Sequence, residues 1–456
     1  MPTTPNWTAH VGWVCDCAPM SRRPALQISK PRLGTLYLNP QDQGRPAMAF
    51  DNGEEIEVTV NFEHGDPIGR RLVGRSLRWG DDPDYTLHDY SLPTQVWFAD
   101  PHGIVCFVEP HGRSNTFGVL QEGRLRFTYA IEVGDVGVSY ERINAMQSRI
   151  EGLEEWIPIS CVSHEYAPST DSSSSSIFTL RRQEPVNISP ALNAQIRPTY
   201  SFTASTVPGE SKFQDEVRIT TGVSKARPWH EHLDVHQGVR DLLVVAGWRD
   251  YGTWDLSVSR HDDPERALAG NPVGERWARV STYAVSRASG GDQRSRYLFD
   301  FEDVGAAGVR RWFRLRHQHR RGIAGMIHSV GMPGVALETA ISEAGAALEH
   351  LGYGIAVESE EAPGRRLERH LRRVAEQATC DLAIDLDTWP ARFADAYNTV
   401  KHPDRPDQWS SLDLSNLLRE ARLVFRAWVG RRLGVTPDML ERNSSLVPMS
   451  RPYERW

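Results

Sequence analysis

Between Leu33 and Val133 the apolar residues come in short runs that are rich in β-branched and aromatic side chains. Such runs predict β-strands, because a strand points successive side chains to opposite faces. The runs are GTLYLNP, EEIEVTVNF, TQVWFAD, GIVCFVEP and GRLRFTYAIEV. Asp100-Pro101-His102-Gly103 separates two of them and has the composition of a hairpin turn. This region is therefore expected to form a mostly antiparallel sheet, either a sandwich or a partial barrel.

The pattern changes in the next part of the chain. Residues 142–160 carry apolar side chains three or four positions apart, which predicts a short amphipathic helix ending in a tryptophan. The five-serine tract at 172–176 predicts a surface loop. Further strands are predicted in SIFTLRR, TYSFTAS, DEVRITTGV, TWDLSVSRH and RYLFDFEDV, and a helix in VHQGVRDLLVVAGW. The span 177–304 is therefore expected to mix α and β structure.

After Val304 the apolar residues recur at helical spacing. Short loops containing Gly or Pro separate the segments, which favours antiparallel packing of neighbouring helices. The predicted helices are VRRWFRLRHQHRRGIAGMI, GVALETAISEAGAALEHLGY, RRLERHLRRVAEQA, WPARFADAYNTVKH and LSNLLREARLVFRAWVGRRLG. The sequence thus predicts a C-terminal helical bundle, and the final NSSLVPMSRPYERW is interpreted as a tail.

The fold class expected from these patterns is α+β, in a chain of 456 residues with room for two or three domains. A poorly ordered segment is predicted over 1–30 and a β-rich N-terminal sheet domain over 31–170. A mixed α+β region that continues this module is predicted over 177–304. An all-α helical bundle is predicted over 305–445.

Composition and charge narrow the function classes. The chain has 52 basic and 59 acidic residues, a net charge of −7, so a basic surface over the whole protein is excluded. No apolar run is long enough to span a membrane, and the first residues lack the pattern of a secretory signal. Five cysteines are too few for a disulfide framework. We therefore expect a cytoplasmic protein.

The stretch from Trp389 to Asp404 holds the side chains that most resemble a catalytic site. On a helix, Asp395, Asn398 and His402 would lie on one stripe. Pro403 disfavours helical backbone at the preceding residue, so the helix should end at His402.

Each polar side chain here has a possible role. His402 can act as a general acid or base near neutral pH, and Asn398 can orient it or hold a phosphate oxygen. Lys401, four residues after Tyr397, offers positive charge to an anionic transition state. The alternative is a polar cluster that only caps and solvates the helix end.

A helical bundle with Asn398 and His402 in an Asn-x-x-x-His arrangement resembles the HEPN superfamily, whose domains carry an Arg, four to six further residues and a His. The early GTLYL strand, the alternating sheet and RIEGLEEWIPIS resemble ApeA-type proteins, in which a β-rich N-terminal region precedes a HEPN domain. The resemblance implies an anti-phage protein that cleaves RNA without a metal or other cofactor. It also implies that two protomers bring their motifs together, that the His assists attack by the ribose 2′-OH and that the Arg stabilises the phosphate charge.

This sequence departs from the HEPN pattern, because Asp395, Ala396 and Tyr397 occupy the positions where the Arg is expected. Arg392 lies ten residues before His402, about 15 Å along a helix. The missing charge could come from a partner protomer or from another basic residue of this chain. The basic residues considered are Lys401, Arg405, Arg419, Arg422 and Arg426. An inactive HEPN-like domain remains the alternative.

A basic island at 310–321 holds six arginines and two histidines around Trp312 and Phe313. Arginines interleaved with aromatic residues suit phosphate contact and base stacking. The alternative is an amphipathic helix with a solvated basic face. The RNA-binding candidates are Arg310, Arg311, Arg314, Arg316, Arg320, Arg321, Arg392 and Arg405.

Metal and nucleotide sites find little support. His232 and His236 have the spacing of a helical zinc pair, but no further ligand is evident nearby. We interpret residues 229–236 as surface polar residues that lead into a helix, with Asp234 as a possible cap. Cys15 and Cys17 lack a second pair, and no phosphate-binding glycine motif is present.

The sequence therefore predicts an anti-phage abortive-infection protein whose bundle cleaves RNA without metal, gated by the β-rich region. The catalytic candidates are His402, Asn398 and Lys401. The expected partners are tRNA or another cellular RNA, a phage-derived trigger, and further copies of the chain in a homodimer or larger assembly, with no membrane. The alternative is an inactive RNA-binding, dimerisation or sensor module. A carbohydrate-binding or hydrolytic sandwich is a third, less supported interpretation.

Overall fold

The computed structural model describes residues 25–63, 92–116, 120–167, 175–204, 211–285, 296–331, 334–402, 404–405, 408–447 and 449–454. Most of the segment predicted to be poorly ordered, residues 1–24, lies outside the described residues, as do 172–174 of the serine tract.

Within the described residues, six strands close a barrel, because β6 pairs with β3 along one edge and with β5 along the other. These strands are β1 (Arg32–Tyr37), β2 (Arg45–Asp51), β3 (Ile56–Glu63), β4 (Gln95–Asp100), β5 (Gly103–Thr116) and β6 (Leu120–Val133). Their buried side chains, among them Val58, Phe98, Phe107 and Phe127, form one hydrophobic cluster. The predicted strands and the hairpin at Asp100 are confirmed, and β2 is a strand that the sequence analysis missed.

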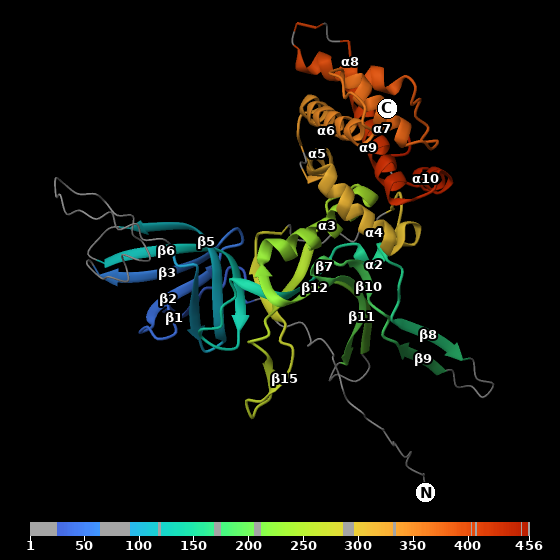
Figure 1. The fold of residues 1–456 in the computed structure, drawn as a ribbon. Coiled ribbons are helices and arrows are strands. Elements are labelled where there is room, and N and C mark those ends of the chain that lie inside the picture. Colours follow the sequence, from blue (N-terminus) through green and yellow to red (C-terminus); the bar gives the residue numbers. More distant parts are fainter. Residues whose placement is uncertain are drawn as a thin grey trace, which may run out of the picture.

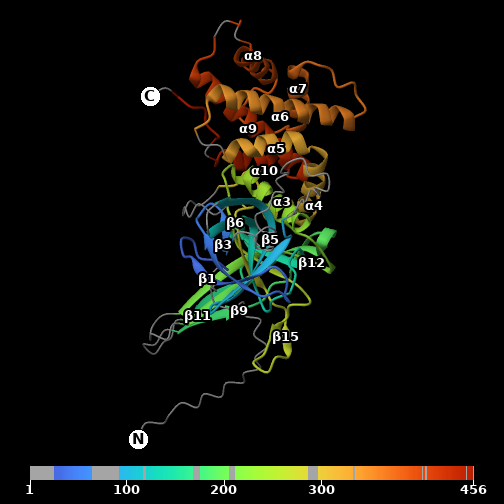
Figure 2. The ribbon, with the colours of Figure 1, turned by 90° about the vertical axis from the view of Figure 1, so that its left-hand side faces the viewer.

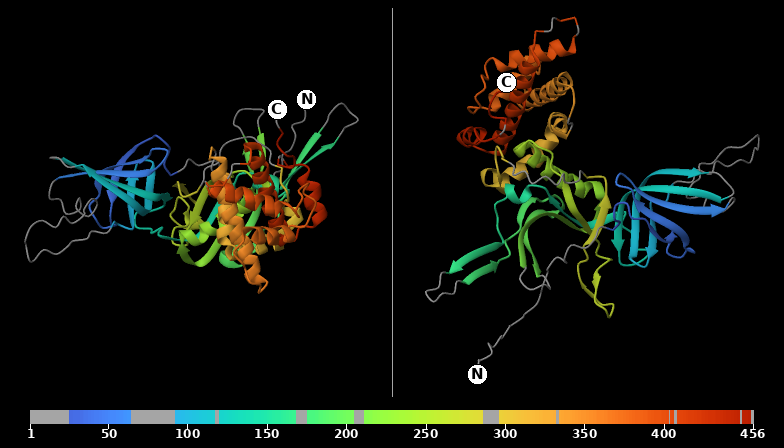
Figure 3. Two further views of the ribbon diagram at one scale, coloured as in Figure 1. Left: turned by 90° about the horizontal axis from the view of Figure 1, so that it is seen from above. Right: turned by 180° about the vertical axis from the view of Figure 1, so that it is seen from behind.

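A second sheet branches from the barrel where β6 leaves β3 and pairs with β16 instead. The order continues from β16 through β13, β7, β12 and β11 to β10. The bounds are β7 (Arg142–Ile150), β10 (Val186–Ser189), β11 (Ala194–Ala204), β12 (Ser211–Pro228), β13 (Thr253–Ser259) and β16 (Ala278–Thr282). Two small hairpins are β8 (Val162–Ala167) with β9 (Ser175–Leu180) and β14 (Glu265–Arg266) with β15 (Pro272–Gly274). The barrel lies to one side of this sheet, and the helices lie above it (Figure 1 and Figure 3).

The helix predicted over 142–160 is wrong for most of its length. Residues 142–150 form β7, and only α2 (Leu153–Trp156) is helical. β7 pairs on both edges and is buried on both faces, with Met146 and Ile150 on one face and Ala145 and Arg149 on the other. A strand buried on both faces loses the simple alternation, so its apolar spacing imitated a helix.

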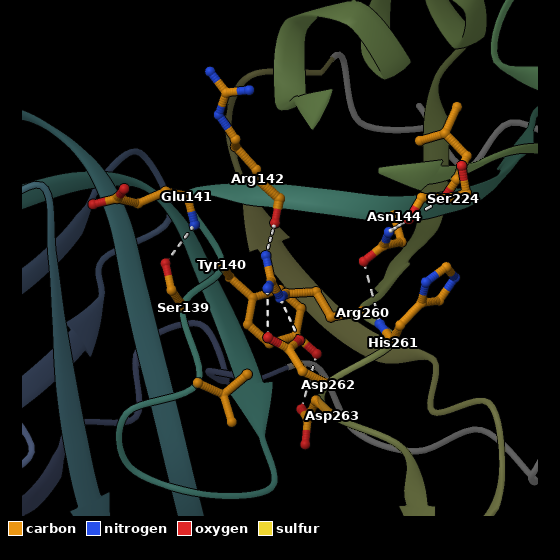
Figure 4. Close-up of polar contacts among 12 residues, drawn as sticks. Ser139, Tyr140, Glu141, Arg142, Asn144, Ser224, Arg260, His261, Asp262 and Asp263 are labelled. Atoms are coloured by element: carbon orange, nitrogen blue, oxygen red, sulfur yellow. Dashed lines mark hydrogen bonds and ion pairs between the residues drawn. The ribbon is translucent and has the colours of Figure 1, made fainter. Parts of the chain in front are cut away.

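A polar cluster fixes the junction between the barrel and the second sheet (Figure 4). The buried Asp263 carboxylate accepts a hydrogen bond of 2.9 Å from the Tyr140 hydroxyl, and burial raises the pKa of that tyrosine. Arg260 pairs with Asp262 and donates to the Arg142 carbonyl at 2.6 Å. These contacts join loops on both sides of the junction.

The helices are α3 (Trp229–Gly247), α4 (Phe301–Gln318), α5 (Arg320–His328), α6 (Leu337–Glu358), α7 (Leu367–Gln377), α8 (Trp389–Lys401), α9 (Ser411–Leu433) and α10 (Pro437–Ser444). The strand expected in RYLFDFEDV is wrong, because Asp300 forms a capping box with Asp303 and starts α4 at Phe301. The first predicted bundle helix is divided at His319 into α4 and α5. The predicted tail overlaps the end of α10. Seen from the side, the bundle stacks on the sheets (Figure 2).

His232 and His236 of α3 are buried, although His230 is exposed, so the interpretation of 229–236 as surface residues before a helix is wrong. α3 begins at Trp229, and Asp234 lies inside it, where its carboxylate pairs with Arg316. His236 Nδ1 lies 2.6 Å from the Ser148 hydroxyl, and His232 Nδ1 lies 2.8 Å from that of Thr221. These contacts anchor α3 on the sheet.

Acid is expected to destabilise the protein through these two histidines. Burial lowers the pKa of His232 to about 4 and that of His236 to about 3. An unfolded histidine titrates near 6.5, so between about pH 6.5 and 4 the unfolded chain binds more protons than the folded one. The contribution of these histidines to the free energy of unfolding is therefore fully present above pH 6.5 and is lost as the pH falls. The loss from His232 alone is about 3 kcal/mol at pH 4.

Urea denaturation of the full chain across this pH range measures the effect. The double variant His232→Asn/His236→Asn is expected to show a flatter dependence of the unfolding free energy on pH than the wild type. Equal steepness in the two proteins would contradict the assignment of the acid sensitivity to α3.

Candidate active site at the end of helix α8

One face of α8 is set by the bundle core. Trp389, Phe393, Ala396 and Tyr397 are buried, and the helix packs against α6, α7 and α9. The helix begins after Thr388, whose hydroxyl donates to the Asp385 carboxylate at 2.6 Å. The other face is left for polar residues.

The predicted end of the helix is confirmed. His402 is the C-cap residue with extended backbone angles, and its N–H donates to the Asn398 carbonyl at 3.0 Å. The side chains of His402 and Lys401 are exposed, and Asn398 is half-buried. The three catalytic candidates therefore lie together at one end of α8, open to a ligand.

Two of the three positions where a HEPN domain is expected to carry its arginine are part of the core, and the third is the partly exposed Asp395. Ala396 is fully buried and Tyr397 is 8% exposed. Gly345 of α6 makes room for the tyrosine ring, since a Cβ there would lie 2.2 Å from Tyr397 Cδ2. The Tyr397 hydroxyl accepts a hydrogen bond of 3.3 Å from Lys401 Nζ. An arginine at 396 or 397 would have to enter this apolar contact.

Several basic candidates are committed to other contacts. Arg392 forms an ion pair of 3.0 Å with Glu420 of α9. Arg419 is buried and donates to the Met449 carbonyl, and Arg426 is buried and donates to the carbonyls of Val245 and Ala246. The arginines of α9 that were considered as substitutes thus include two that face the interior. The half-buried Arg422 lies 5.9 Å from the Trp248 ring centroid.

Arg405 is the basic candidate that the structure brings to α8. Its N–H donates to the His402 carbonyl at 3.0 Å, and its guanidinium lies 3.6 Å from the Asp395 carboxylate. The sequence analysis named both residues but did not pair them, because the pairing depends on how the loop after α8 turns.

The basic island at 310–321 is largely a joint between elements. Arg310 donates to the Asn187 carbonyl, Arg311 to that of Leu433, and Arg316 pairs with Asp241 at 2.9 Å. Trp312 is fully buried and its indole N–H donates to the Gly238 carbonyl, so this ring is not exposed for stacking on RNA bases. Arg314, Arg320 and Arg321 are exposed, and RNA binding by them stays a prediction.

The sequence also holds an arginine and a histidine at HEPN spacing that the analysis passed over, Arg365 and His370. His370 is 2% exposed, and the backbone of Gly352 lies directly against it. The amphipathic pattern of α7, with His370 on its apolar side, was the available signal that this pair is not a site.

A second missed cluster lies where α4 meets α5. His319 Nε2 lies 2.8 Å from Glu358, which also pairs with Arg432 at 2.9 Å. Burial lowers the pKa of His319, and Glu358 opposes that shift. This contact ties the break between the helices to α6 and α9.

Two family models match the chain. ApeA N-terminal domain 1 matches residues 104–312, from β5 into α4, and Apea-like HEPN matches residues 358–439, which include α7, α8 and α9. The chain has the ApeA-type architecture. The resemblance of the sheet region and of the bundle is thereby confirmed, and His402 lies inside the HEPN domain. No curated protein and no solved structure shows a significant match to the chain.

The described residues add two observations. None of their helices has the length and apolar character needed to cross a membrane. They contain no cluster of three or more histidine, cysteine, aspartate or glutamate side chains placed to hold a metal ion.

Proposed function

We propose that this ApeA-type protein acts in anti-phage defence by abortive infection and that its HEPN domain cleaves cellular RNA, tRNA or another species, at His402 without a metal. The observation that carries the proposal is the exposed His402 at the C-cap of α8, beside Asn398 and Lys401, within the HEPN match. An exposed imidazole can transfer a proton, and the neighbouring cation and amide can bind a phosphate.

The chemistry follows from these groups. His402 takes the proton of a ribose 2′-OH, whose oxygen attacks the adjacent phosphorus while the bond to the 5′-oxygen breaks. The products are a 2′,3′-cyclic phosphate and a 5′-OH, which receives its proton from the imidazolium. The need for a 2′-OH restricts the reaction to RNA. Asn398 donates its amide to a phosphate oxygen, and Lys401 offsets the developing negative charge.

In this proposal the N-terminal region senses a phage-derived trigger and gates the HEPN domain. A direct contact between the two family matches supports it, because the buried Arg426 of α9 donates to carbonyls at the end of α3. The open end of α8 also leaves the site accessible to a second copy of the chain, in keeping with a homodimer or larger assembly.

A specific observation favours a second candidate function. Because Ala396 and Tyr397 fill the core where an arginine is expected, the HEPN domain could bind RNA or a second copy without cleaving. In that case the exposed Arg314, Arg320 and Arg321 would contribute to RNA binding, and His402 would be dispensable.

An RNA gel from phage-infected cells separates the two functions. Discrete RNA fragments are expected with the wild type and none with His402→Ala, although both proteins accumulate. Infection is part of the design because the gated domain is expected to stay silent without a trigger. Identical RNA and intact phage protection in both strains would overturn cleavage at His402 and favour the binding function.

A further inference from the structure

Cleavage at His402 calls for a positive group that is held against the phosphate, because negative charge grows there in the transition state. Lys401 is exposed, and its ammonium lies 5.3 Å from the Tyr397 ring centroid and donates to the hydroxyl of that tyrosine at 3.3 Å. Arg392 is paired with Glu420. The inference that follows rests on the proposed function and concerns Arg405.

The path of the Arg405 side chain is fixed at both ends. Its backbone N–H meets the His402 carbonyl at 3.0 Å, so the residue starts at the end of α8. Its guanidinium lies 3.6 Å from the carboxylate of Asp395, which is ten residues before Arg405 in the chain. Asp395 is seven residues before His402, about 10 Å back along the helix. Asn398 lies between Asp395 and His402 on the same stripe of α8, so the guanidinium is held on the stripe that carries the candidate site.

Asp395 also accepts hydrogen bonds from the loop that follows α8. Its Oδ2 accepts hydrogen bonds from Gln408 Nε2 at 2.7 Å and from Trp409 Nε1 at 3.2 Å. Trp409 packs on the hydrophobic core, which anchors the loop. The carboxylate therefore holds the start of α9 and the Arg405 guanidinium at the same time.

The Asp395–Arg405 pair is too exposed to contribute much stability. The side chains are 40% and 45% exposed, and pairs of this kind contribute about 0–1 kcal/mol. The same exposure leaves the guanidinium within reach of a ligand. A guanidinium that meets Asp395 through one nitrogen keeps its other N–H groups for a phosphate.

We propose that Arg405 is the group that holds the scissile phosphodiester of RNA at this site and that Asp395 is its positioning residue. Arg405, in the loop after His402, supplies the positive charge that a HEPN domain is expected to carry on its helix. Positions 396 and 397 are buried and do not supply that charge. Residues of a single copy of the chain would then be enough to bind the phosphate.

Binding of an uncleavable RNA tests Arg405 separately from cleavage. The probe is a labelled 20-nucleotide RNA with 2′-O-methyl groups throughout, titrated with the full chain at several salt concentrations. Arg405→Ala is expected to weaken binding about tenfold and to reduce the salt slope by about one. The matched control is Arg372→Ala, since Arg372 is also paired with an acid, Glu368 at 3.2 Å, and should bind as the wild type does.

Asp395→Asn tests positioning. It keeps an oxygen for Gln408 and Trp409 but loses the charge that orients Arg405, so kcat on cleavable RNA should fall about tenfold while the affinity for the methylated RNA does not fall. Millimolar guanidinium should restore part of the activity of Arg405→Ala, and an altered fold would not respond in this way.

The outcomes for Arg405 and for the proposed function are distinguishable. If Arg405→Ala binds the methylated RNA as tightly as the wild type does, the role of the pair is overturned. The same holds if the fall in kcat of Asp395→Asn is accompanied by a loss of thermal stability. Unchanged cellular RNA with His402→Ala would overturn cleavage itself, whatever the result for Arg405.

Discussion

Alanine in place of His402 is expected to slow RNA cleavage by the purified, triggered protein about a thousandfold, within the usual range for a general acid–base group. The reason is that the exposed stripe of α8, which also carries Asp395 and Asn398, holds no imidazole other than that of His402. Because the side chain is exposed at the C-cap, the unfolding free energy should change by less than about 0.5 kcal/mol. Single-turnover cleavage and urea denaturation measure the two quantities.

A matched control is available in the same bundle. His350 of α6 is also an exposed helical histidine, and His350→Ala should cleave at the wild-type rate. The RNA affinity of His402→Ala, measured with the 2′-O-methylated probe, should equal that of the wild type. Equal loss of cleavage in both alanine variants would contradict a specific role for His402.

The second large effect is expected from Arg426→Ala, which should lower the free energy of unfolding by about 3 kcal/mol. Arg426 is 1% exposed, its pKa is lowered to about 9 by burial, and it donates to the Val245 carbonyl at 2.8 Å. Its removal leaves that carbonyl without this donor and opens a cavity between α3 and α9. The carbonyl end of α3 carries the negative end of the helix dipole, which explains how an arginine is tolerated there.

Urea denaturation followed by tryptophan fluorescence measures this loss. Arg432→Ala is the control, because Arg432 also lies on α9 but pairs with Glu358 at a partly exposed site. Its loss should cost less than about 1 kcal/mol. Similar destabilisation by the two variants would show that burial of Arg426 between the matched regions has no special importance.

The fold was predictable where one periodicity dominated. The barrel strands alternate in burial, as in β3, and Pro403 marked the end of α8. β7 was not predictable by the same rule, because it is buried on both faces. The start of α4 was obscured by the aromatic residues before Asp300, which pack without forming a strand.

The candidate site was predictable only in part. The position of His402 followed from local rules, since a proline after it disfavours a longer helix. The partner of each arginine could not be predicted from local rules, because tertiary contacts decide it. Arg316 pairs with Asp241, and Arg405 pairs with Asp395. Burial of Tyr397 against Gly345 likewise depends on how α6 packs on α8.

The most direct test of the central claim is the chemistry of the RNA ends. Full-length protein, triggered by extract from phage-infected cells and kept in EDTA, is incubated with cellular RNA, and the fragment termini are determined. Attack by the 2′-OH predicts 2′,3′-cyclic phosphate and 5′-OH ends that form in EDTA and are absent with His402→Ala. Fragments with 5′-phosphate ends, or cleavage that EDTA abolishes, would contradict metal-independent cleavage at this site.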